Sequence, residues 1–113
     1  MKLTAEHVKA MYGCLVDLPP FNKWNLPDKH DVDFRVLKTP RWHADHWKDS
    51  GHHIRVSSAR CSHAFTLLRD VAHEMVHLHL KHNKIHERHD HGIAFRTAAS
   101  LVCRELGLDP LEF

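Results

Sequence analysis

Residues 73–77, H-E-M-V-H, place two imidazoles and a carboxylate in the pattern of a zinc-dependent hydrolytic site. In a helix, His73 and His77 lie one turn apart on the same face. Both rings can then reach one ion at about 2.0–2.1 Å, the usual Zn–N distance. Glu74 is rotated from His73 by about 100° around the helix axis, so its carboxylate lies beside the ion rather than among its ligands. The spacing therefore predicts Glu74 as a general base.

The abundance of histidine weakens any single histidine motif, because 14 of the 113 residues are histidine. A shuffled chain of this composition would contain H-E-x-x-H in roughly 5–10% of cases. The alternative is that His73 and His77 are solvated or core side chains. The context favours the metal site, because an apolar stripe that includes Phe65, Leu68 and Ala72 leaves both histidines on another face of the predicted helix.

A third ligand must come from farther along the chain, and His91 is the best placed donor. It opens a predicted helix after a polar loop, and Gly92 beside it permits close backbone approach. His86 and His89 compete with it, but they lie within the loop, where ligand geometry is held less firmly.

Two other ligand sets match the chain less well. The metzincin pattern needs glycine and histidine where this chain has Leu80 and Asn83. A carboxylate ligand from a later helix would have to be Glu105, which stands alone near a helix end. The predicted metal ligands are therefore His73, His77 and His91.

Three protein ligands would leave one zinc position for water, and the metal would lower the pKa of that water to about 7. Glu74 would accept its proton and later pass a proton to the leaving amine. The predicted strand at 54–57 precedes the helix and could hold a peptide by edge pairing. The sequence does not single out one group that would stabilise the oxyanion. The only tyrosine, Tyr12, is distant in sequence from the motif. Candidates are His79, His89 and Arg96.

Helical periodicity predicts the elements that must position these residues. Apolar side chains recur at helical spacing over residues 5–17, 62–82 and 91–106. Thr4 is a suitable N-cap for the first helix, and Gly107 is a suitable stop for the last.

Strand patterns lie between the first two helices. Apolar and charged residues alternate over 32–36, which predicts a half-buried strand. The D-S-G at 49–51 predicts a turn within a β-hairpin over 41–58, whose second arm carries Ile54 and Val56. The order helix, strands, helix, helix predicts an α+β domain with a small antiparallel sheet.

Two segments together resemble a known family. HEMVH at 73–77, followed by HGIAF at 91–95, is similar to the SprT-like (Spartan-type) zinc metallopeptidase domain. The segment IRVSSARCSHAFTLLRDVA before the first motif also resembles the strand that leads into that family's active-site helix. The resemblance covers roughly residues 3–106 and is most specific over 54–95.

That resemblance implies a zincin-like minimal metalloprotease fold, with zinc on His73, His77 and His91 and with Glu74 as the catalytic residue. It implies a protein or peptide substrate, and it makes DNA-associated proteins candidate substrates. The expected organisation is a single SprT-like domain over residues 1–113, without the C-terminal zinc ribbon that many members add.

Composition is that of a globular chain, with 42% apolar residues and a net charge of +2, too small by itself to indicate nucleic acid. Cys14, Cys61 and Cys103 form no C-x-x-C pair, which argues against a cysteine zinc finger and a disulfide framework.

No apolar run reaches the roughly 20 residues that span a membrane. We expect a soluble, cytoplasmic protein, or a nuclear one in a eukaryote, with no membrane partner. The oligomeric state is left open.

Weaker patterns suggest other roles. Trp42 and Trp47 could stack on unpaired bases, although such residues more often cover a sheet face. Zinc could also stabilise a non-catalytic module that binds DNA or a protein partner, but such a site has no need of Glu74. Four further histidines flank the predicted turn and could form a second metal site, or could simply be exposed polar residues. They are His43, His46, His52 and His53.

Overall fold

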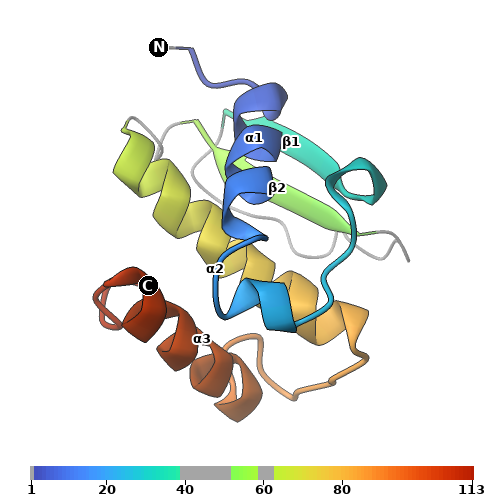
Figure 1. The fold of residues 1–113 in the computed structure, drawn as a ribbon, viewed down its shortest axis with the longest axis vertical. Helices are drawn as coiled ribbons and strands as arrows, with labels where there is room; N and C mark the ends of the chain where they lie inside the picture. The colour runs from blue at the N-terminus through green and yellow to red at the C-terminus, as the bar shows by residue number, and fades with distance from the viewer. Residues whose placement is uncertain (1, 39–51, 59–62) are drawn as a thin grey trace.

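The structure is a computed structural model that describes residues 2–38, 52–58 and 63–113. The elements in these ranges are three helices, two strands and two short 3-10 turns (Figure 1). They are α1 (Ala5–Leu15), η1 (Phe21–Lys23), η2 (Lys29–Asp31), β1 (Asp33–Leu37), β2 (His53–Ser57), α2 (Ala64–His82) and α3 (Ile93–Leu106). No helix among the described residues has both the length and the apolar character needed to cross a bilayer.

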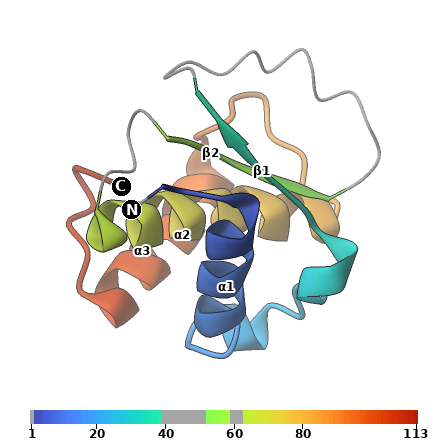
Figure 2. The same cartoon turned by 90° about the horizontal axis from the view of Figure 1, so that it is seen from above.

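Helix α2 is the centre of the fold, because β2, α1 and α3 all pack against it. Figure 2 shows the two strands on one side of α2 and α3 on the other. Helix α1 contacts both α2 and β1, so it joins the helical and strand layers. The small α+β arrangement surrounds the one helix that carries the H-E-x-x-H motif.

The core forms where the predicted apolar faces meet. Helix α1 buries Val8, Tyr12 and Leu15, as its helical spacing predicts. Phe65, at the first turn of α2, is an exception to the predicted apolar stripe, because 60% of its surface is exposed. The buried side chains of α2 are Leu67, Val71, Ala72, Met75, Val76, Leu78 and Leu80.

The sheet is parallel, so the predicted antiparallel sheet is wrong. Strand β1 pairs with β2 in a register that runs from Asp33 opposite His53 to Leu37 opposite Ser57. Parallel neighbours need a crossover of a dozen or more residues, and residues 38–52 are long enough to supply one. The predicted turn at 49–51 and the first arm of the hairpin lie outside the described residues.

The predicted helix ends are close to the observed ones. Thr4 is the N-cap of α1, and its backbone N–H donates to His7 Nδ1 at 3.0 Å. Gly107 follows α3 with a φ of 71°, a left-handed conformation that glycine adopts without steric cost. The Leu108 N–H then donates to the carbonyl of Cys103 at 2.9 Å, which closes the helix.

Candidate metal centre

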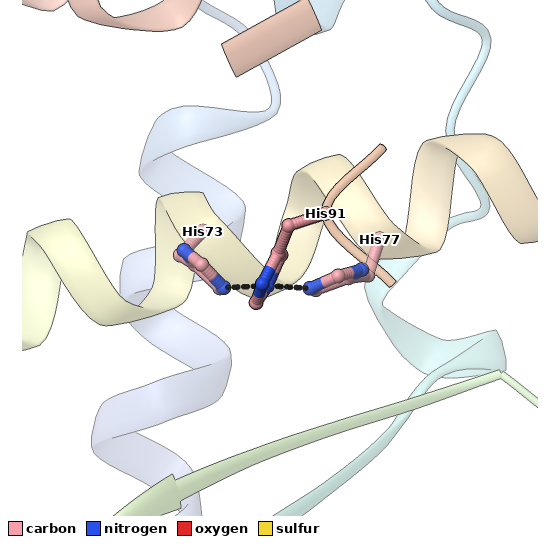
Figure 3. A group of neighbouring side chains, drawn as sticks. All are labelled: His73, His77 and His91. Carbon is pink, nitrogen blue, oxygen red and sulfur yellow. Dashed lines mark hydrogen bonds between the residues drawn. The ribbon is translucent and has the colours of Figure 1, made fainter. Parts of the chain in front are cut away.

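The three predicted ligands lie together, with His73 and His77 on one face of α2 and His91 in the turn before α3. His91 Nε2 is 3.2 Å from His73 Nε2 and 3.1 Å from His77 Nε2 (Figure 3). Ligands at about 2.0–2.1 Å from a tetrahedral ion lie roughly 3.3 Å apart, so these separations suit one shared ion. The three residues therefore form a group that could hold a metal ion.

The ring of His73 is oriented by the C-terminal segment. His73 Nδ1 lies 2.7 Å from the backbone oxygen of Phe113, to which its N–H can donate. This hydrogen bond leaves the lone pair of His73 on Nε2, the atom that faces His91. The Phe113 ring also lies 5.3 Å from that of His73, measured between centroids. No motif in the sequence marks Phe113 for this role.

Phe95, on the first turn of α3, forms an apolar backing for all three imidazoles. Its ring centroid lies 5.0 Å from that of His73, 4.5 Å from that of His77 and 4.6 Å from that of His91. Phe95 is itself buried. Contact with one rigid aromatic ring restricts the rotamers of the three histidines, which favours a fixed site.

The segment that carries His91 is tied to the start of α3 by Glu87. The Glu87 carboxylate accepts from the backbone N–H groups of Ala94 and Phe95, so it satisfies donors that a helix N-terminus leaves free. A Cβ at Gly92 would lie only 2.9–3.0 Å from that carboxylate. Gly92 is therefore needed to leave room for Glu87, a more specific role than the close backbone approach expected from the sequence.

Glu74 shares a cavity with the three histidines. The cavity has a volume of about 620 Å³ and lies between β2, α2 and the segments on either side of α3. Arg55 of β2 also lines it, and the negative charge of Glu74 acts on that guanidinium. Burial nevertheless lowers the pKa of Arg55 from its ordinary value. The predicted base and the histidine cluster thus face the same space.

Comparison with known proteins gives no further assignment. No family model, curated protein or solved structure matches this chain. The resemblance to SprT-like domains over residues 54–95 therefore stays a prediction from the sequence. The chemistry must be argued from the geometry of the site.

The electrostatic environment keeps His77 uncharged at neutral pH. Burial, and to a smaller extent the neighbouring His73 and His91, together lower the pKa of His77 to about 4. Asp90 and Glu87 oppose this shift with their negative charges. A neutral imidazole has a lone pair free for a metal ion, so His77 can bind a metal at neutral pH without first losing a proton.

His79, His89 and Arg96, which were suggested for the oxyanion, do not line this cavity, and neither does Tyr12. His79 stacks on Trp24 at 4.1 Å between ring centroids, and His89 and Arg96 are exposed. The buried hydroxyl of Tyr12 donates to the carbonyl oxygen of Pro27 at 2.6 Å, and burial raises its pKa. These four residues therefore have other surroundings in the fold.

Basic residues that the sequence did not mark for the oxyanion line the cavity instead. They include Arg55 and His53 from β2 and Lys81 from α2. Alternation along β2 places His53, Arg55 and Ser57 on the face opposite the buried Ile54 and Val56, and these three residues line the cavity together with Val56. This period-2 pattern was the sequence signal that could have identified these cavity residues. The direction of the strand was also needed to show that this face lies toward α2.

The histidines around the predicted turn separate into different groups. His43 and His46 lie outside the described residues, as do Trp42, Trp47 and Cys61. His53 Nδ1 lies 3.3 Å from Asp33 Oδ2 on the neighbouring strand. His52 Nε2 instead lies 3.3 Å from Nδ1 of His82, the last residue of α2.

Proposed function

We propose that this protein is a zinc-dependent peptidase in which His73, His77 and His91 hold the metal and Glu74 is the general base. One observation carries the proposal: three histidine Nε2 atoms converge beside a glutamate in a cavity large enough for a peptide segment. The combination is the arrangement that metal-assisted hydrolysis requires.

The donor set fits zinc. Three imidazoles with an additional free position are a catalytic zinc environment. The Nε2 atom of His91 lies 3.1 Å from that of His77 and 3.2 Å from that of His73, and both separations suit tetrahedral coordination. Phe113 fixes the His73 tautomer by accepting from Nδ1, and the lowered pKa of His77 keeps its ring neutral. A site of this kind favours a borderline metal over calcium or magnesium, which prefer oxygen ligands.

Each residue of the site would have its own role in hydrolysis. A zinc ion at the triad would polarise the scissile carbonyl and lower the pKa of the attacking water. Glu74, next to His73 on α2, would accept a proton from the attacking water and deliver a proton to the leaving amine. Arg55 and Lys81 place positive charge on the cavity wall, where it offsets the charge that develops on the carbonyl oxygen.

The substrate of this proposal is a protein or peptide. Strand β2 runs along the cavity, so an extended peptide could follow it and present one bond to the triad. We propose the SprT-like type on the strength of the sequence resemblance over residues 54–95, which makes DNA-associated proteins the first substrates to test. DNA itself is a candidate partner through the same resemblance.

The Glu74→Gln variant tests the proposal directly. Glutamine keeps the shape of the side chain but cannot accept the proton, so hydrolysis should fall by about 10²–10⁴-fold while zinc content stays at one per chain. Peptide and protein hydrolysis would be measured with and without single-stranded DNA, beside zinc analysis and circular dichroism. Glu112→Gln is the matched control, because it neutralises another carboxylate that lines the cavity.

The outcomes separate the enzyme from a zinc-stabilised module that binds DNA or a protein. Equal cleavage by wild type and Glu74→Gln would show that Glu74 is not the base. Loss of zinc and of fold in that variant would make Glu74 a structural residue. Equal inactivity across a broad screen, with zinc retained in both proteins, would favour the binding module.

A further inference from the structure

A second pair of histidines lies beside the cavity and shares the geometry of the first. His52 Nε2 and His82 Nδ1 are 3.3 Å apart, close to the separations in the triad. Their ring centroids lie 5.1 Å apart at 65°, and the His73 and His77 rings have the same distance and angle. Two imidazoles in this relation can bind one ion, because tetrahedral coordination at about 2.0–2.1 Å needs nitrogens roughly 3.3 Å apart.

The backbone holds both histidines in place before any ion binds. His82 is the last residue of α2, and His52 immediately precedes β2. The His52 carbonyl accepts from the Asp33 N–H at 2.9 Å, which extends the parallel pairing by one bond. Both side chains are half-buried, so their rotamers are restricted. A site held by the end of a helix and by the residue that leads into a paired strand needs little reorganisation to bind metal.

The charges around the pair differ from those around the triad. The negative charge of Asp31 acts on His52, but Lys81 and His53 act on it with the opposite sign. With two protein ligands and mixed charge, this pair should bind a cation less tightly than three converged imidazoles do.

We propose that His52 and His82 form a second, weaker site for a divalent transition metal that prefers imidazole, such as zinc. The neighbours of these residues in the chain, His53 and Lys81, line the main cavity, so the second ion would lie at its rim. An ion there connects the start of β2 to the end of α2. It leaves coordination positions for water or for a donor group of a bound molecule.

A direct hydrogen bond between the two imidazoles also accounts for a 3.3 Å separation. The two interpretations differ in metal stoichiometry. Zinc bound by the pair gives a second equivalent beyond the triad, whereas a hydrogen bond alone gives none. An ion at this site also stabilises the folded protein at excess zinc, because it binds the folded chain and not the unfolded one.

The test is calorimetric titration of zinc into the full chain whose triad already holds one zinc. We expect a second equivalent that binds at least about 100-fold more weakly than the first, with a dissociation constant below about 1 mM. It should disappear in His52→Gln and in His82→Gln. It should persist in His86→Gln and His89→Gln, which remove exposed histidines of the loop after α2.

Retention of the first zinc in each variant shows that the protein is folded, so loss of the second equivalent is then local. A second equivalent that survives in both His52→Gln and His82→Gln would overturn the assignment. So would the absence of any second equivalent in the wild-type protein up to about 1 mM zinc. Neither result depends on peptidase activity, so this site and the proposed function can fail separately.

Discussion

His91 is held differently from the other two histidines of the triad, because it belongs to no helix. The backbone of α2 places His73 and His77 one turn apart, so their spacing is a local property. His91 lies in the turn before α3, and its side chain is exposed. Its position depends on contacts with Phe95 and on the neighbouring Gly92. The triad is therefore most vulnerable at this residue.

Replacement of His91 by alanine should weaken zinc binding by at least about 100-fold, beyond the 10–100-fold typical of losing a group that only hydrogen-bonds to a metal ligand. His86→Ala and His89→Ala should change zinc affinity little, because neither side chain belongs to the converged group. Competition with a chromophoric chelator would measure all three affinities. Equal losses in the three variants would mean that the third ligand has been misassigned.

At the scale of elements, the N-terminus of α3 is capped by a carboxylate that comes from outside the helix. Gly92 occupies the N-cap position, where it offers no side-chain acceptor. Glu87 supplies that acceptor, and its negative charge also suits the positive end of the helix dipole. Because His91 lies between Glu87 and the helix, the cap that stabilises α3 also holds the third ligand.

The contact between Gly92 and Glu87 predicts a non-additive pair of substitutions. Glu87→Ala should destabilise the fold by about 1 kcal/mol through loss of the cap. Gly92→Ala should cost a similar free energy, about 1 kcal/mol, because its new methyl group displaces the same carboxylate from the helix N-terminus.

In the Glu87→Ala background, the Gly92→Ala change should be nearly neutral, since the clashing group is gone and the φ of −76° suits alanine. Denaturant unfolding of the four proteins measures this coupling, and zinc affinity should follow the same pattern. Strictly additive losses would contradict the proposed contact.

At the scale of the whole molecule, the metal-free fold should be sensitive to mild acid. His77 in the folded chain has a pKa of about 4, whereas an unfolded histidine has its ordinary value near 6.5. Between these values the unfolded chain binds a proton that the folded chain does not. Stability is therefore complete above pH 6.5 and falls as the pH drops toward 4.

For His77 this loss should be about 2 kcal/mol at pH 5 and should approach about 3 kcal/mol near pH 4, from roughly 1.4 kcal/mol per pKa unit. Urea unfolding of chelator-treated protein at pH 7.5 and pH 5 would measure it. His77→Gln should reduce the slope but not abolish it, because the pKa values of His52 and His79 are also lowered, chiefly by burial. Greater stability at pH 5 than at pH 7.5 would contradict the prediction.

Sequence alone determined the features that depend on local geometry. The positions of the helices follow from apolar periodicity, and the i, i+4 relation of His73 and His77 follows from the helical repeat. Gly107 ends α3 for an equally local reason, its left-handed φ. His91 could be selected because few other histidines lay at a usable distance with a helix behind them.

Only the tertiary structure decided the contacts that join distant segments. An alternating strand pattern has the same appearance in parallel and antiparallel sheets, so the direction of β2 relative to β1 depended on the path of the connection. The arrival of Phe113 at His73 and of Arg55 opposite Glu74 also depended on packing around α2. Such contacts leave no spacing in the sequence, because they follow from how whole elements bury their apolar faces together.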